Sequence, residues 1–330
     1  MRGNLDIFTH SRMEIPGIDW QKCAFTEDDA GLLVENFSRL GFLLLRNHGI
    51  SGQLVEEAFR IAQKFFLLDS SVKKRFLRGT LSDNNAGYVA YQMESLNTAN
   101  TDKKEALNIT CSPWLLPDSL SFLSRLDDFY REAFALGMHI LEQLGSFLSP
   151  CGDKNVLRKY HSFQSLGVYT EKDGIVAKEK KKKKKAASTL RLLHYPPSSS
   201  SSSTETDLEV LAGAHSDYGT ITLLFQDSCG GLQVQHGAEW VSVPAQEQGA
   251  LVVNAGDLLE IWTGGRIPST KHRVVATPEL FNSFNGRYSI AVFIHPDDDT
   301  LVQPLFGNTE KYQSVLASDY VGGRFQVSYP

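Results

Sequence analysis

The second half of the chain contains many short runs of β-forming residues, and this pattern restricts the possible folds more than any other feature. Glycine, proline, asparagine and aspartate separate the runs at close intervals. Short strands with this spacing are typical of an antiparallel sandwich or barrel. The pattern therefore predicts a β-rich core. The expected strands are residues 190–195, 221–225, 232–235, 240–243, 250–254, 258–262, 272–275 and 287–295.

The first half has helical signals instead. Thr26 and Asp29 have the spacing of a capping box, and apolar residues follow at helical intervals until Gly41. We expect a buried strand at residues 42–45 and a second helix that begins after Ser51. This helical part should pack against the β-core rather than fold independently of it.

A long helical pattern separates the two halves. Between residues 118 and 149 an apolar residue recurs every three or four positions, which predicts a helix with one face on a core. The predicted fold class is mixed α/β (α+β), with a β-core buttressed by N-terminal and long central helices. We divide the 330 residues into an N-terminal region (1–117), a long supporting helix (118–160) and a core region (161–330).

Two low-complexity runs interrupt the predicted core, with six lysines at 180–185 and six serines at 198–203. We place insertions near 178–187 and 198–206 to accommodate them. Six like charges repel one another and cannot pack, so a solvated insertion is favoured over a nuclear signal or an anionic docking site. The net charge of −5 agrees, because it gives no general attraction to nucleic acid or anionic membranes.

Other bulk features predict a cytoplasmic protein without membrane or nucleic-acid partners. No apolar run approaches the ~18 residues of a membrane-spanning helix, and the N-terminus leads into no apolar segment of a secretory signal. The four cysteines are far apart and form no CxxC pattern, which indicates free thiols. We expect a monomer that acts on a small molecule.

A possible metal site begins with His215 and Asp217, which one residue separates. Alternate residues of a strand point to the same face, so both side chains could bind one ion. Alone the pair is weak evidence, because a turn held by Asp217 would also explain it. His272, at the start of another β-prone run, would complete two histidines and one carboxylate. That set suits non-haem Fe(II), and zinc with a hydrolytic water is the alternative.

Arg287 and Ser289 form a second pair on one strand face. A guanidinium binds a carboxylate through two parallel hydrogen bonds, and a neighbouring hydroxyl adds another. Beside a metal pocket, this pair is what a dicarboxylate such as 2-oxoglutarate needs, and Tyr195 could add a phenolic bond. A hydrolase has no use for such a clamp, so the pair favours iron. Taken singly, Arg287 would be a surface ion pair and Tyr195 a buried ring.

At these residues the chain resembles the Fe(II)/2-oxoglutarate-dependent dioxygenases of the isopenicillin N synthase-like branch. GFLLLRNHGI resembles the N-terminal signature, and AHSDYGTITLLFQDSCGGLQV, VVNAGDLLEIWTGGRIPSTKHRVV and RYSIAVFIHP resemble the catalytic core. The resemblance covers most of the chain and implies a double-stranded β-helix, or jelly roll. It implies that His215, Asp217 and His272 bind iron, and that Arg287 and Ser289 bind the distal carboxylate of 2-oxoglutarate with help from Tyr195.

One departure from the family pattern is visible. Many members have Asn-x-Tyr where this chain has Leu193-His194-Tyr195, so the tyrosine is kept and the amide is not. Within the family, LRLLHYP, HSDYGTITLLFQDS and VVNAGDLL look similar to fungal thymine 7-hydroxylase-like proteins. That likeness implies substrate contacts by Arg191, Tyr218 and Phe293, with a planar ring on the aromatics and Arg191 donating to a carbonyl.

The expected function is oxidation, most simply hydroxylation, of a small organic metabolite. Fe(II) would be the cofactor, 2-oxoglutarate and O₂ the co-substrates, and succinate and CO₂ the by-products. Hydroxylation of thymine or another pyrimidine is a narrower alternative, and a desaturating or cyclising oxygenase is another. A β-sandwich binding protein, a zinc hydrolase and an oxygenase that modifies protein or nucleic acid stand as rivals from other classes.

Overall fold

The computed structural model describes residues 14–22, 26–79, 85–96, 101–112, 114–170, 188–197, 208–245, 249–307 and 310–329. The predicted insertions near 178–187 and 198–206 lie outside these residues. The strands are β1 (Gly17–Asp19), β2 (Phe42–Arg46), β3 (Gly87–Val89), β4 (Glu105–Ile109), β5 (Trp114–Leu116), β6 (Val168–Thr170), β7 (Thr189–Tyr195), β8 (Val210–His215), β9 (Ile221–Gln226), β10 (Leu232–His236), β11 (Glu239–Ser242), β12 (Leu251–Ala255), β13 (His272–Val275), β14 (Arg287–Ile294), β15 (Leu301–Val302) and β16 (Val315–Leu316). The helices are α1 (Glu27–Leu40), α2 (Gly52–Phe66), α3 (Ser70–Lys74), α4 (Leu126–Leu148), α5 (Asn155–Arg158), α6 (Asp257–Trp262), α7 (Pro278–Phe281), α8 (Ala317–Ser328) and the 3-10 turns η1 (Trp20–Lys22) and η2 (Asp118–Arg125).

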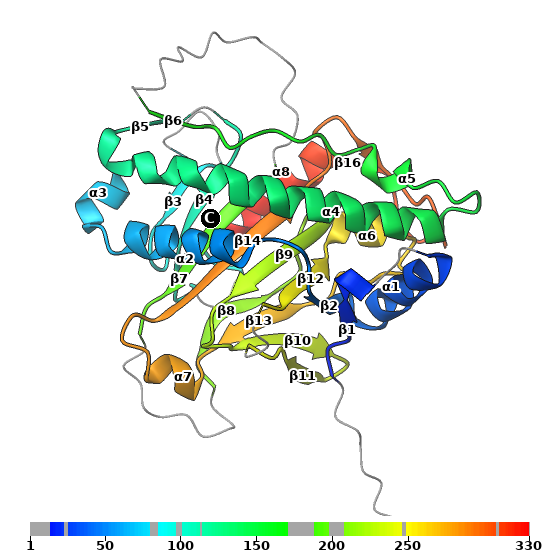
Figure 1. Cartoon of the computed structure of the whole chain (residues 1–330), viewed down its shortest axis with the longest axis horizontal. Coiled ribbons are helices and arrows are strands. Elements are labelled where there is room, and N and C mark those ends of the chain that lie inside the picture. Colours follow the sequence, from blue (N-terminus) through cyan, green and yellow to red (C-terminus); the bar gives the residue numbers. More distant parts are fainter. Residues whose placement is uncertain are drawn as a thin grey trace, which may run out of the picture.

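Two sheets form the core of the molecule (Figure 1). In the described part of the chain, the large sheet has the strand order β1-β2-β12-β9-β14-β7-β4-β3, and the small sheet has the order β11-β10-β13-β8. The strands from β7 to β14 are divided between the two sheets and pair antiparallel. This is the double-stranded β-helix that the family resemblance implied. Strands from the N-terminal region extend the large sheet on both sides.

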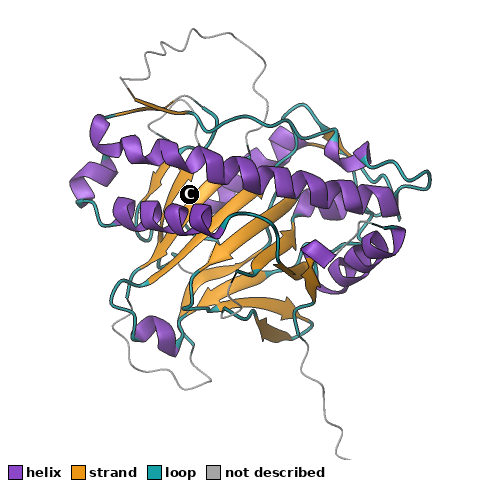
Figure 2. Cartoon of the chain, viewed as in Figure 1, coloured by secondary structure: helices purple, strands orange, loops and turns teal. Residues whose placement is uncertain are grey.

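The large sheet is buried on both faces. On one face α2 and α4 lie across it, and α4 contacts β9 and β14 (Figure 2). Ile290 and Val292 of β14 belong to this helix-covered core, whereas Ala291 belongs to a second core with residues of the small sheet. Because successive residues of a strand alternate between faces, Arg287 and Ser289 lie on the same inner face as Ala291. The alternation thus delivers polar side chains to the space between the sheets.

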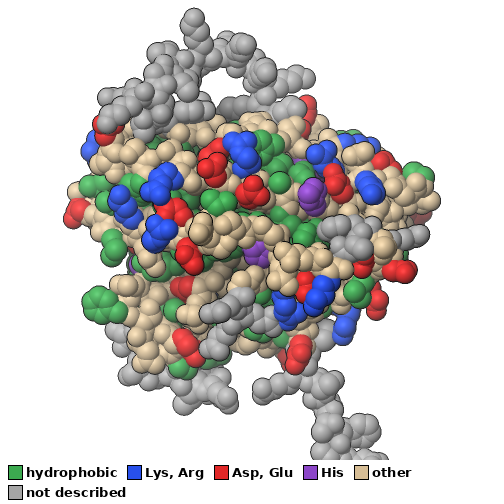
Figure 3. All heavy atoms as spheres, in the orientation of Figure 1, with side chains coloured by type: hydrophobic (Ala, Val, Ile, Leu, Met, Phe, Trp, Pro, Cys, Tyr) green, Lys and Arg blue, Asp and Glu red, His purple; other side chains and the backbone are tan. Residues whose placement is uncertain are grey.

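The predicted helices are largely confirmed. Thr26 and Asp29 form the capping box of α1, and Gly41 ends that helix in the left-handed conformation with φ of 68°. The long central helix begins at Leu126, because residues 118–125 form the 3-10 turn η2. Among the described residues, none of the helices has the length and apolar character needed to cross a membrane. Basic and acidic side chains are interspersed on the face seen in Figure 3.

Two local predictions are wrong. Residues 258–262 form most of the helix α6 and not a strand, and Leu258, Leu259 and Trp262 in it are fully buried. Four of these five residues are apolar, and so short an apolar run has too little periodicity to separate a helix from a strand. The polar composition of residues 83–101, rich in glycine and asparagine, predicts a loop, but the strand β3 lies within them. The division of the chain at residues 117 and 160 stays a prediction.

The helix-covered core gives a test of the packing. Leu223 of β9 is fully buried beneath α4, where a Cβ on Gly137 would lie 3.5 Å from its Cδ1. Leu223→Ala should lower the free energy of unfolding by about 2–5 kcal/mol, because it leaves a cavity. Leu32→Ala is the control, since Leu32 is 49% exposed on α1, and should change it by less than about 0.5 kcal/mol. Equal losses in urea denaturation would contradict the packing described here.

Candidate active site

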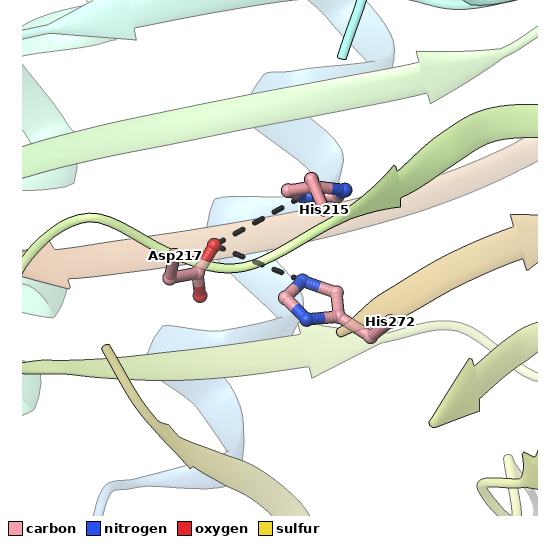
Figure 4. Close-up of side chains that lie close together, drawn as sticks. All are labelled: His215, Asp217 and His272. Atoms are coloured by element: carbon pink, nitrogen blue, oxygen red, sulfur yellow. Dashed lines mark ion pairs between the residues drawn. The ribbon is translucent and has the colours of Figure 1, made fainter. Parts of the chain in front are cut away.

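His215, Asp217 and His272 come together between the two sheets (Figure 4). His215 ends β8, His272 begins β13, and the two residues pair across these strands. Oδ1 of Asp217 lies 3.7 Å from Nε2 of His272 and 4.0 Å from Nε2 of His215. One ligand atom of each side chain lies within 4.8 Å of the other two. This separation fits one metal ion that all three side chains bind.

The backbone that carries Asp217 differs from the predicted strand. The prediction that one strand carries both His215 and Asp217 is wrong, since β8 ends at His215 and Asp217 lies in the irregular segment that follows. The backbone carbonyl of Asp217 accepts a 2.8 Å hydrogen bond from the N–H of Asp257, the first residue of α6. Contact with α6, rather than strand periodicity, therefore fixes the backbone beside the histidines.

Two glycines allow α6 to approach this segment closely. A Cβ on Gly256 would lie 2.3 Å from the carbonyl oxygen of Gly219. A Cβ on Gly219 would lie 2.6 Å from Nδ1 of His295 and 2.7 Å from the carbonyl oxygen of Ile294. Real Cβ atoms essentially never show contacts under 3.0 Å. The backbone geometry around Asp217 thus requires glycine at both positions.

Hydrogen bonds orient each candidate ligand. Nδ1 of His215 donates to the carbonyl of Gly213 at 2.7 Å, and Nδ1 of His272 donates to the carbonyl of Thr270 at 3.2 Å. A proton on Nδ1 leaves the Nε2 lone pair of each ring free to bind a metal. These backbone contacts therefore select the tautomer that a metal site needs.

The carboxylate of Asp217 is held by the large sheet. Its Oδ2 accepts hydrogen bonds from Oγ1 of Thr222 at 2.5 Å and from Nδ2 of Asn254 at 2.7 Å. Thr222 lies in β9 and Asn254 in the neighbouring β12. Because Oδ2 is occupied, Oδ1 is the oxygen that faces the histidines. The sequence reasoning missed both residues, although Asn254 lies within the VVNAGD motif.

The electrostatic surroundings favour the protonation states of a metal site. Burial, together with the nearby His272, lowers the pKa of His215 to about 3. Burial alone would raise the pKa of Asp217, but the two histidines and the bonds from Asn254 and Thr222 outweigh it, so the pKa lies below its ordinary value. Neutral imidazole and ionised carboxylate are the forms that bind metals. Two nitrogens and one carboxylate oxygen fit Fe(II) with open positions for further ligands.

A cavity extends from this cluster along the inner face of the large sheet, and all the residues predicted to bind metal, co-substrate or substrate line it. Arg287 in it is 1% exposed. Its guanidinium donates to the carbonyl of Gly230 at 2.6 Å, to Ser289 Oγ at 3.1 Å and to Gln226 Oε1 at 3.4 Å. All three acceptors are neutral. A buried cation without a carboxylate partner is costly, so this position calls for an anionic ligand.

Tyr195 lies next to this guanidinium. The two residues pair across β7 and β14, and Cζ of Arg287 lies 4.8 Å from the centre of the Tyr195 ring. Leu193, two residues earlier, also lines the cavity at the place of the asparagine found in many family members. His194 lies outside the cavity lining, where its Nδ1 lies 2.8 Å from Oε1 of Glu105.

The three predicted substrate-binding residues differ in whether their side chains already have partners within the protein. The guanidinium of Arg191 pairs with Glu94 at 2.6 Å, while its Nε is buried without a hydrogen-bond partner in the described part of the chain. The hydroxyl of Tyr218 forms a 2.5 Å hydrogen bond with Ser328 of α8. Phe293, on the inner face of β14, offers its ring to the cavity. Sequence reasoning missed Glu94, since nothing local to that residue indicates that a partner 97 positions away requires it.

Comparisons with known proteins agree with this geometry. Residues 186–296 match the model of the 2OG-Fe(II) oxygenase superfamily, and residues 15–128 match the non-haem dioxygenase N-terminal model. UPF0676 protein C1494.01 of Schizosaccharomyces pombe is 28% identical over 96% of this chain and 93% of that protein. The 2-oxoglutarate-dependent dioxygenase frbA of Dothideomycetidae sp. is 29% identical over 89% of this chain and 90% of its own length.

Solved structures give the same result. The full-length thymine 7-hydroxylase of Neurospora crassa, in complex with alpha-ketoglutarate (2-oxoglutarate) and 5-formyluracil, is 29% identical with a TM-score of 0.76, over 95% of this chain and 96% of that one. Its C-terminally truncated apo form is 30% identical with a TM-score of 0.62, over 86% of this chain and 95% of that one. The resemblance seen in the sequence is confirmed: the chain belongs to the Fe(II)- and 2-oxoglutarate-dependent oxygenase superfamily.

Proposed function

We propose that this oxygenase oxidises a small organic molecule, most simply by hydroxylation, with conversion of 2-oxoglutarate to succinate and CO₂. The observation that supports this best is that one cavity contains two separate binding features, one suited to a metal ion and one to an anion. One is the cluster of His215, Asp217 and His272, and the other is the buried guanidinium of Arg287, which has no carboxylate partner among the described residues. A metal-dependent hydrolase would need the metal-binding cluster only.

His215, Asp217 and His272 would hold the iron through two Nε2 atoms and Oδ1. When bound, Fe(II) supplies the redox chemistry that couples O₂ to decarboxylation of 2-oxoglutarate. The protein's part is to hold both imidazoles in the tautomer that leaves Nε2 free, and to present one carboxylate oxygen. The backbone acceptors at Gly213 and Thr270 perform the first task.

Arg287 would bind the distal carboxylate of 2-oxoglutarate, and Ser289 and Tyr195 would assist it. The guanidinium provides the positive charge, and the Ser289 hydroxyl lies beside Nη1 in the same strand. Tyr195 supplies a ring against the guanidinium, which stabilises a cation by the ring's quadrupole. Because Leu193 offers no hydrogen bond, this chain gives the co-substrate an apolar contact where many relatives have an amide.

The helix α8 shields the cavity from solvent. Phe325 and Tyr329 line the cavity, and Tyr218 is bonded to Ser328. Arg324 donates to Ser216, between two of the candidate iron ligands, at 3.2 Å. Exclusion of water protects reactive intermediates from side reactions. α8 therefore completes the site that the two sheets begin.

Hydroxylation of a pyrimidine is the narrower candidate. The Neurospora enzyme has been solved with thymine and with 5-formyluracil, and this chain matches the thymine complex at 27% identity and a TM-score of 0.74. Tyr218 and Phe293 are aromatic residues of the cavity lining that a planar ring could contact. Desaturation and ring closure need the same iron site, and a succinate-release screen of nucleobases and other small metabolites would separate these outcomes by product.

Removal of an iron ligand should stop turnover. His215→Ala and Asp217→Ala are each expected to lower substrate-dependent succinate formation by at least about 10²-fold, because the ion loses a ligand. Circular dichroism and the thermal midpoint should show that both variants remain folded. Normal turnover in either variant would exclude these residues as iron ligands.

Arg287 should matter for the co-substrate. Arg287→Ala is expected to raise the KM for 2-oxoglutarate by about 10²-fold, since a buried charge-assisted pair contributes about 2–5 kcal/mol. Arg273→Ala is the matched control, because Arg273 lies outside the cavity with its side chain over Trp240 and should leave this KM unchanged. An unaltered KM for the first variant would refute the clamp.

Asn254 should tune metal affinity without touching the ion. Asn254→Ala removes one of the two donors to Oδ2 of Asp217 and is expected to weaken Mn(II) or Fe(II) binding by about 10–100-fold. Calorimetric titration of the apoprotein measures this directly. Asn282→Ala, at the end of α7, removes only a local bond to Pro278 and should bind the metal normally. Equal affinity in all three proteins would show that the bond to Asp217 is incidental.

A further inference from the structure

Four charged side chains form a buried cluster at the wall of the cavity, and three of them line it. They are Glu94, Asp102, Lys104 and Arg191, named here the four-charge cluster. Glu94 binds Arg191 through two contacts of 2.6 and 3.1 Å, and its Oε2 also lies 2.9 Å from Nζ of Lys104. Lys104 is paired in addition with Asp102. Side chains of Glu94, Asp102 and Lys104 are at most 3% exposed.

The four-charge cluster is neutral as a whole. Although burial opposes it, the charges of Arg191 and Lys104 hold the pKa of Glu94 well below its ordinary value. Burial likewise opposes the charged form of Lys104, but Glu94 and Asp102 raise the pKa of that amine above its usual range. Two anions and two cations therefore cancel. Since Glu94 contacts both cations, it is the residue on which this balance depends.

The proposed function already gives each of the other charged residues of the cavity a ligand of opposite charge. In the described lining, the charged residues outside the four-charge cluster are Asp217 and Arg287. A divalent iron bound by the Asp217 carboxylate keeps one positive charge. Dianionic 2-oxoglutarate bound by Arg287 keeps one negative charge. These two cancel as well, so the loaded site has no spare charge for the substrate.

We propose that the substrate of this enzyme is uncharged, and that Glu94 determines this selectivity by occupying the cations of Arg191 and Lys104. The inference rests on the proposed function, because it counts the iron and the co-substrate as bound. An ionic group that entered the cavity would lose its hydration and gain no counter-charge, which is strongly unfavourable. Neutral carbonyl, amide and hydroxyl groups have a much smaller desolvation cost, which hydrogen bonds to the polar wall can offset.

The first measurement uses the wild-type protein. It is loaded with Mn(II) and N-oxalylglycine, an unreactive analogue of 2-oxoglutarate, so that Arg287 is occupied. Binding is then measured by calorimetry for matched pairs of probes, such as benzoate with benzamide and indole-3-acetate with indole-3-acetamide. The carboxamides should bind at least about tenfold more tightly than their carboxylates. Equal or tighter binding of the carboxylates would overturn the proposal.

The second measurement uses Glu94→Gln, which is similar in size and releases one positive charge into the wall. Its affinity for the carboxylates should rise at least about tenfold, while that for the carboxamides should change much less. In Glu94→Gln/Arg191→Gln the wall is neutral again, and the gain should disappear. If Glu94→Gln gains no affinity for the carboxylates, Glu94 does not set the selectivity. This criterion also applies if no probe binds the wild type.

Glu105→Gln is the matched control. Glu105 is also a buried, ion-paired carboxylate, but it pairs with Lys73 on the helix-covered side of the large sheet and does not line the cavity. This variant should keep the wild-type preference. Failure of the proposed function is separately visible, because the wild type would then not bind N-oxalylglycine. If Glu94→Gln does not fold, the preference of the wild type still decides the question.

Discussion

The carboxylate of Asp217 is the point at which the two sheets are joined into one site. Its backbone follows a strand of the small sheet, whereas its Oδ2 is bonded to Thr222 and Asn254 in neighbouring strands of the large sheet. The two histidines both belong to the small sheet. Any shift of one sheet against the other would therefore separate the carboxylate from the imidazoles. The extensive packing of helices on the far face of the large sheet keeps that sheet in place.

The cavity contains two guanidiniums, those of Arg191 and Arg287, and their hydrogen-bond partners differ in charge. This difference gives each side chain its role. Within the described residues, Arg191 has a carboxylate within hydrogen-bonding distance, whereas the acceptors of Arg287 are all neutral oxygens. A residue type alone therefore says little about what a pocket will bind. The partner of the charge decides whether the side chain attracts an ion or merely shapes a wall.

Much of the site could be predicted from the sequence, since period-two alternation places Arg287, Ser289 and Phe293 on one face whatever the surrounding fold. Most strand positions followed from the same pattern. Two kinds of failure have a clear physical cause. Residues 258–262 are apolar except for Glu260, and the run is too short for its pattern to distinguish α6 from a strand. Glu94 and Asn254 act through partners distant in sequence, and one sequence does not reveal such pairs.

The contacts of Gly219 and Gly256 have a consequence for how such sequences can diverge. Three motifs meet at these glycines: HSDYG supplies one, NAGD supplies the other, and FIHP supplies the backbone and the histidine that crowd the first. No side chain can be added at one position without moving the main chain of another motif. Part of the sequence signature of the family thus reflects a steric requirement for glycine at these two positions. A descendant that lost its iron ligands and its activity would still be under pressure to keep those glycines.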